Sequence, residues 1–124
     1  MNVDTNIIIA YLADEPNVVY FIDQLKTNKV KLFISSIVEA ELISQSSLSI
    51  HEISSIFDFI SDYFIVIPID RYTLKSTSYF RRKYPKIKIA DACVLGVSKL
   101  YDLDLITRDQ ELLKITEVTT YNII

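Results

Sequence analysis

The chain has 124 residues, about half of them hydrophobic, and a formal net charge of −3 at pH 7. This length suits one domain with its own core, and no apolar run is long enough to cross a bilayer. A single glycine excludes glycine-rich phosphate loops, and one histidine with one cysteine leaves too few ligands for a zinc site. With no export signal and no possible internal disulfide, we expect a cytoplasmic protein without a membrane partner.

In chain order, the first half predicts a very short strand at residues 2–4 and a helix that runs through Leu12. A second helix begins at Pro16, because proline suits the first helical position. A strand at residues 31–35 then leads directly into a helix over residues 36–44.

In the second half, Ser49 opens a helix, because Glu52 three residues later completes a capping-box pattern. A strand at residues 64–67 and a basic helix over residues 70–84 follow, and this helix ends before a proline. The chain closes with an apolar helix at residues 89–101, a strand at 103–106, a short helix and a strand at 118–123.

These elements alternate as β-α-α-β-α-α-β-α-α-β-α-β, without repeats or linker-like segments. The order predicts an α/β fold in which residues 1–124 form one domain around a short, mostly parallel β-sheet flanked by helices. In such sheets, functional groups gather at the carboxyl ends of the strands.

Four acids fall where that rule directs attention. Asp4 ends the first strand, Glu41 lies in the helix after the second strand, Asp91 opens the apolar helix, and Asp109 follows the strand at residues 103–106. Carboxylates gathered at one edge repel each other, and a divalent cation such as Mg²⁺ or Mn²⁺ removes that conflict. The sequence therefore suggests a metal site of the kind that hydrolyses phosphodiesters through activated water.

Each acid also has a local interpretation. Asp4 could simply cap the first helix, and Asp91 could interact with the dipole of its own helix. Residues 107–110 match a T-x-x-Q capping box, which would make Asp109 an acid in the first turn of a short helix.

Residues 71–88 carry seven positive side chains with no acid between them: Arg71, Lys75, Arg81, Arg82, Lys83, Lys86 and Lys88. A solvated helix face is the ordinary interpretation of such a run. A local surface that attracts a polyanion is the alternative, despite the acidic net charge.

Three segments, taken in order, resemble the PIN-domain family and in particular the VapC-type toxins of toxin–antitoxin pairs. They are VDTNI at residues 3–7, SSIVEAEL at 35–42 and IADACVLGVSKLYDLDLITRD at 89–109. Cys93 and Gly96 depart from the small aliphatic residues more usual in the family, and QELLKI replaces the Asp-Phe pair that often follows the last motif. Periodicity does not choose between Glu39 and Glu41, and the resemblance favours Glu41.

The resemblance implies a Mg²⁺- or Mn²⁺-dependent endoribonuclease. Its catalytic and metal-binding residues would be Asp4, Glu41, Asp91 and Asp109. Thr107 and Asn6 would support the site, Arg81, Arg82, Lys83 and Lys86 would bind RNA, and Glu111 is a possible outer acid. The implied partners are an RNA substrate, a small antitoxin and a second copy of the chain.

Three other functions remain open at this point. A PIN-like scaffold could bind RNA or protein without cutting, and a related fold could cleave DNA. A phospho-receiver domain shares the α/β organisation, but Asp70 is its sole acceptor candidate and no lysine ends the strand at residues 103–106.

Overall fold

The structure is a computed structural model that describes residues 1–123. The strands are β1 (Asn2–Val3), β2 (Phe33–Ser35), β3 (Ile65–Ile67), β4 (Leu105–Ile106) and β5 (Thr120–Tyr121). The helices are α1 (Thr5–Leu12), α2 (Pro16–Thr27), α3 (Ser36–Ile43), α4 (Ile50–Tyr63), α5 (Arg71–Lys83), α6 (Ile89–Tyr101) and α7 (Gln110–Leu113). The predicted order of strands and helices is confirmed.

The strands form one sheet in the order β3-β2-β1-β4-β5, and every pairing between neighbours is parallel. The prediction of a mostly parallel sheet is therefore confirmed, and the described strands are parallel without exception. The chain builds outward from β1 to β3, then crosses back to place β4 on the other side of β1. The direction of winding thus reverses between β1 and β4, and open α/β sheets bind ligands at the carboxyl side of such a reversal.

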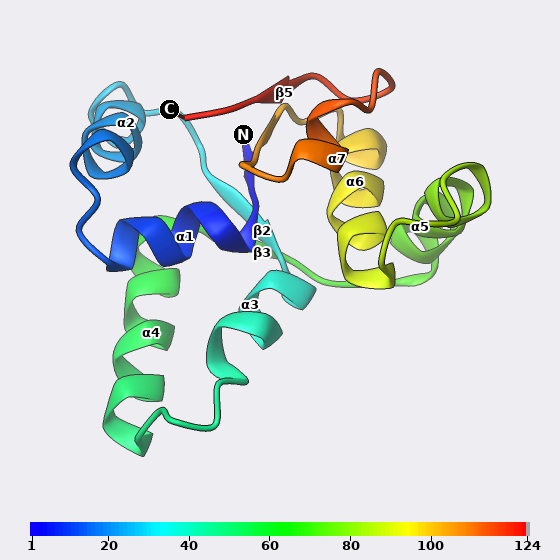
Figure 1. Cartoon of the computed structure of the whole chain (residues 1–124). Coiled ribbons are helices and arrows are strands. Elements are labelled where there is room, and N and C mark those ends of the chain that lie inside the picture. Colours follow the sequence, from blue (N-terminus) through cyan, green and yellow to red (C-terminus); the bar gives the residue numbers. More distant parts are fainter. Residues whose placement is uncertain (124) are drawn as a thin grey trace.

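Figure 1 shows β2 and β3 near the middle of the molecule and β5 along the top, with α1, α2 and α4 at the left and α5, α6 and α7 at the right. The hydrophobic core is one connected cluster that takes side chains from the strands and from the helices around them. Val3, Ile34 and Ile106 from three neighbouring strands are fully buried in it. The core fixes β1 and β4 side by side, so the residues that follow them start from defined positions.

Helix α6 is the most deeply buried helix segment, because every residue from position 92 to 98 is shielded from solvent. It packs along α5, and the one glycine of the chain lies at their contact. A Cβ atom at Gly96 would lie 2.8 Å from the backbone nitrogen of Thr77 and 2.8 Å from its Oγ1. Only a residue without a side chain permits this approach of the two helices.

The helix starts follow the predicted local signals. Ser49 and Glu52 form the capping box, with hydrogen bonds of 3.1 Å in both directions. Pro16 is the first residue of α2, and α5 ends two residues before Pro85. These matches reflect short-range hydrogen bonds at the capping box and the local backbone restriction at the prolines, and neither needs tertiary context.

The strands are shorter than predicted: β5 keeps two of the six residues 118–123, and β4 keeps two of the four residues 103–106. The backbone N–H of Leu103 donates to the Ser98 carbonyl at 2.8 Å, so Leu103 belongs to the exit from α6 and not to β4. Asp102 makes that exit in the left-handed conformation, with φ at 52°. Aspartate tolerates this conformation better than most residues, so no glycine is needed there.

Within the described range, no helix combines the length and the apolar character that a membrane crossing requires.

Candidate active site

Asp4 is the most buried acid of the candidate site, with 4% of its surface exposed. It directly follows β1 and caps α1, and its Oδ1 accepts the Thr5 backbone N–H at 2.8 Å. Its Oδ2 accepts the Thr107 hydroxyl at 2.7 Å and the Asn6 side-chain amide at 3.3 Å. The local interpretation as a helix cap is therefore correct, and the same carboxylate also lies at the reversal point of the sheet.

Burial raises the pKa of Asp4 above its ordinary value, because it removes water from the charged form. The hydrogen bonds from Thr107 and Thr5 lower the pKa, while the charges of Glu41 and Asp109 raise it. Asp4 is thus a desolvated carboxylate surrounded by further negative charge.

Thr107 joins the ends of β1 and β4. Its fully buried hydroxyl donates to Asp4 and accepts the Asp109 backbone N–H at 3.0 Å. Asn6 adds a second link, because its Oδ1 accepts the Arg108 backbone N–H at 3.2 Å. Asn6 and Thr107, both predicted as supporting residues, therefore lie against Asp4.

The capping box expected over residues 107–110 is wrong. Asp109 is the N-cap of α7, and its Oδ1 accepts the backbone N–H groups of Glu111 at 2.8 Å and Leu112 at 3.3 Å. Thr107 does not cap the helix, because its hydroxyl oxygen accepts the backbone N–H of Asp109, which lies before α7, while its hydroxyl hydrogen is donated to Asp4.

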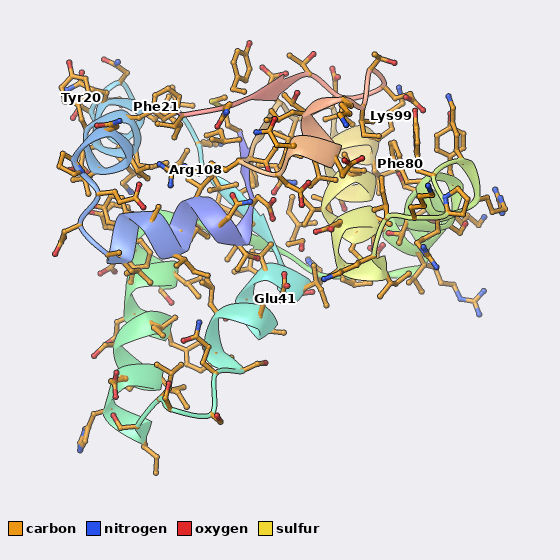
Figure 2. The ribbon with its side chains drawn as sticks, in the orientation of Figure 1. Tyr20, Phe21, Glu41, Phe80, Lys99 and Arg108 are labelled. Atoms are coloured by element: carbon orange, nitrogen blue, oxygen red, sulfur yellow. The ribbon has the colours of Figure 1, made fainter. Side chains whose placement is uncertain are left out.

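Glu41 lies near the end of α3 and is exposed, and in Figure 2 it lies beside the first turn of α1. Its Oε1 accepts the Thr5 hydroxyl at 2.8 Å. Glu41, and not Glu39, is among the charges that raise the pKa of Asp4 and of Asp91. The geometry thus orients Glu41 toward the other acids.

Asp91 lies in the first turn of α6 and is half-buried. Burial raises its pKa to about 6, and the negative charges of Asp4, Asp109 and Glu41 add to the increase. The positive charge of Lys88, the N-cap residue of α6, lowers it. The four predicted acids come from different elements and lie within electrostatic reach of one another.

The model of the PIN domain matches residues 1–118 of this chain. The chain belongs to the PIN domain family. PIN domains are generally nucleases that use divalent metal ions. Membership of this family excludes the phospho-receiver alternative and confirms the resemblance to PIN domains.

The fold is shared with several solved complexes. A toxin–antitoxin complex from Klebsiella pneumoniae is 26% identical, with 98% of each chain covered and a TM-score of 0.78. VapBC2 from Rickettsia felis, bound to a DNA fragment from its promoter, is 21% identical with a TM-score of 0.81, and 98% of this chain and 96% of that chain are covered. VapBC-1 from nontypeable Haemophilus influenzae is 19% identical with a TM-score of 0.79, at the same coverage. None of the curated proteins matches the chain.

The four carboxylates of this PIN domain lie within electrostatic reach of one another but do not converge on one point. Across residues 1–123, no three His, Cys, Asp or Glu side chains stand near enough to hold a metal ion as they are placed. The donor set nevertheless fits a hard cation, because it consists of carboxylates whose mutual repulsion a cation would relieve.

The basic block of the PIN domain divides into two groups. Arg81 donates to the backbone carbonyls of Pro85, at 2.8 Å, and of Ile87, and so fastens the loop between α5 and α6. Lys83 forms an ion pair with Glu117 at 2.9 Å. Arg82 and Lys86 are exposed. The predicted RNA-binding set thus contains two side chains that already serve the fold.

Two residues near the acids were not predicted as site residues from the sequence. Lys88 sits three residues before Asp91, and its position at the end of the basic run was the available signal. Thr5 directly follows Asp4, and only its hydroxyl next to an acid hinted at a role.

Arg108, between Thr107 and Asp109 in sequence, points away from the acids. Its Nη2 pairs with Glu15 at 2.7 Å, and its Nε donates to the Ile123 carbonyl at 3.3 Å. Figure 2 shows this side chain on the side of the molecule where α2 lies. Arg108 therefore fastens the loop after β4 to the residue before α2 and to the segment that follows β5, and does not join the site.

Proposed function

We propose that this PIN domain is a metal-dependent endoribonuclease and the toxin of a VapBC-type toxin–antitoxin pair. The observation that carries the proposal is the buried carboxylate of Asp4, fixed at the reversal point of the sheet with Glu41, Asp91 and Asp109 in electrostatic reach. Family membership adds nuclease chemistry, and the solved complexes of the same fold add the toxin–antitoxin setting.

Asp4, Glu41, Asp91 and Asp109 would hold Mg²⁺ or Mn²⁺ in this site, directly or through water. A bound cation of this kind lowers the pKa of water and offsets charge on the leaving oxygen. Hydrogen bonds from Thr107 and Asn6 keep the Asp4 carboxylate in one orientation. This buried carboxylate would therefore need no rearrangement when a cation binds. The Asp91 side chain accepts no hydrogen bond in the described part of the chain, so its carboxylate can turn toward a cation.

The RNA would approach over the exposed cations that precede Asp91 in the chain. Arg82 and Lys86 are exposed, and Lys88 already lowers the pKa of Asp91 from the N-cap of α6. Phosphates held by these side chains would run toward the carboxylates. Arg81 and Lys83 would contribute less than predicted from the sequence, because the fold uses both.

We predict that Arg82→Ser and Lys86→Ser each weaken RNA binding and make it less dependent on salt. Each lost phosphate contact reduces the slope of log affinity against log salt by about 0.7 for single-stranded RNA. Fluorescence anisotropy over a salt series measures this, with the Asp4→Asn protein used throughout so that the RNA stays intact. Lys99→Ser is the matched control, because Lys99 is exposed at the far end of α6. Equal losses from all three variants would contradict a local RNA path.

Three further features belong to the same proposal. The solved complexes with this fold are toxin–antitoxin pairs, which supports a small antitoxin as the partner that silences the nuclease. A homodimer is proposed on the family resemblance alone. An RNA substrate would place the activity in the cytoplasm.

The direct test is cleavage of cellular RNA and of single-stranded DNA by purified protein with Mg²⁺, Mn²⁺ or EDTA, beside the Asp4→Asn variant. We expect RNA cleavage that needs metal and that falls in Asp4→Asn by more than the roughly 10- to 100-fold typical for loss of an outer-shell partner. Equal activity of the two proteins would mean contamination and would end the catalytic proposal. RNA binding without cleavage would instead support a non-catalytic scaffold. Cleavage of DNA alone would change the proposed substrate from RNA to DNA.

A further inference from the structure

One residue contacts two of the acids at once. Thr5 donates its backbone N–H to Asp4 Oδ1 and its side-chain hydroxyl to Glu41 Oε1, each at 2.8 Å. Asp4 follows β1, and Glu41 lies on α3. Thr5 and Glu41, which the hydroxyl contact joins, are 36 residues apart in sequence. Thr5 is therefore a bridge between two proposed metal ligands that come from separate elements.

Glu41 depends on this bridge for its orientation. It lies near the end of α3 and is exposed to solvent, and its side chain accepts no other hydrogen bond in the part of the chain that the structure describes. A long exposed side chain explores several rotamers unless something holds it. The contact uses only Oε1, so the second carboxylate oxygen stays open.

Threonine suits this task better than other hydroxyl residues. Its branched Cβ restricts the first side-chain torsion, so the hydroxyl has few directions available. Thr5 is also the first residue of α1, and its backbone N–H is committed to Asp4. The position of the hydroxyl is thus tied to the most buried acid of the site.

We propose that Thr5 is a positioning residue that holds the Glu41 carboxylate toward Asp4 and so strengthens the binding of a divalent cation by the pair. This inference rests on the proposed function, because it assumes that both acids are metal ligands. Thr5 does not touch the substrate in this role; it acts through Glu41.

The test compares Mn²⁺ binding by calorimetry in the wild type, Thr5→Val and Thr5→Ser. Val has the shape of Thr without the hydroxyl, and Ser keeps the hydroxyl without the second branch. We expect Thr5→Val to weaken Mn²⁺ binding by about 10-fold, at the lower end of outer-shell effects. Thr5→Ser should recover most of the affinity, and thermal unfolding should show both variants folded.

A second arm uses Glu41→Gln as the background. If Thr5 acts through Glu41, then Thr5→Val should change Mn²⁺ affinity little once Glu41 is replaced. An equal loss in both backgrounds, or wild-type affinity in Thr5→Val, overturns the positioning role while leaving the nuclease proposal intact. Absence of Mn²⁺ binding in the wild type overturns both.

Discussion

Asp91→Asn is expected to abolish RNA cleavage and, in metal-free protein at pH 7, to raise the melting temperature. Both effects have one cause. The negative charge of Asp91 would help to bind the cation, but in the metal-free protein the same charge destabilises the fold. Burial and the charges of Asp4, Asp109 and Glu41 raise the pKa of Asp91 to about 6. Removal of an acid that served only the fold would have the opposite effect on stability.

The pH dependence follows from the sign of the shift. The folded protein binds the Asp91 proton more tightly than the unfolded chain, where the pKa is near the ordinary 3.8. Protonation of Asp91 therefore stabilises the folded state. This stabilisation is complete below about pH 4 and is lost as the pH rises through about 6. At full weight the shift corresponds to about 3 kcal/mol, and solvent screening at this half-exposed carboxylate reduces it to the order of 1 kcal/mol.

Thermal unfolding in EDTA between pH 4 and pH 8 measures the effect. We expect Asp91→Asn to melt about 4 °C above the wild type at pH 7 and close to it at pH 4. Asp58→Asn is the control for general removal of a negative charge, because Asp58 is exposed on α4. Two results would contradict this: a difference in melting temperature that stays constant with pH, or a variant that melts below the wild type at pH 7. Either would show that the negative charge of Asp91 does not destabilise the folded protein.

The order of the elements could be predicted because its signals are local. Apolar periodicity marks the longer helices such as α2 and α4, and the capping box of Ser49 and the proline at position 16 fix two helix starts within a few residues. The strand ends could not be predicted in this way. Leu103 has the side chain of a strand residue, but its N–H is already bonded to the end of α6.

The site could be predicted in outline for a topological reason. In a parallel sheet the residues after each strand share one edge, so Asp4 and the segment after β4 had to be neighbours once the strands paired. The hydrogen bonds among them were beyond the sequence. Thr107 has two plausible partners in the chain, and only the fold shows that it donates to Asp4 and leaves the cap of α7 to Asp109.

The basic run illustrates the same limit from the surface. A row of positive residues shows where charge is, and not which side chains the fold already uses. Arg81 and Lys83 are the immediate neighbours of Arg82 in sequence, yet both are bonded within the chain while Arg82 is exposed. The carbonyls and the carboxylate that engage them become neighbours only through tertiary structure.

Gly96→Val is expected to give the largest loss of stability of any substitution considered. The first added carbon would lie 2.8 Å from the Thr77 backbone nitrogen, a contact that no side-chain rotation can relieve. Overpacking of this kind costs about 1–3 kcal/mol, and replacement of a helical glycine returns only roughly 0.3–0.5 kcal/mol. We expect the melting temperature to fall by about 10 °C.

Lys99→Val is the matched control, because it introduces the same side chain at an exposed position of α6. It should cost no more than about 0.5 kcal/mol. A second variant, Gly96→Ala, adds only the first carbon and should lie between the control and Gly96→Val. If Gly96→Val melted like the control, the two helices would not be packed as closely as the structure has them.

The consequence of Gly96→Val should reach the site through α6. Asp91 is on the same helix, five residues before Gly96, and α6 cannot move away from α5 without moving Asp91 relative to Asp4. A variant that remains folded at low temperature should therefore bind Mn²⁺ more weakly than the wild type, although Gly96 touches no acid. The close contact of α5 and α6 thus belongs to the geometry of the carboxylates as much as to the stability of the core.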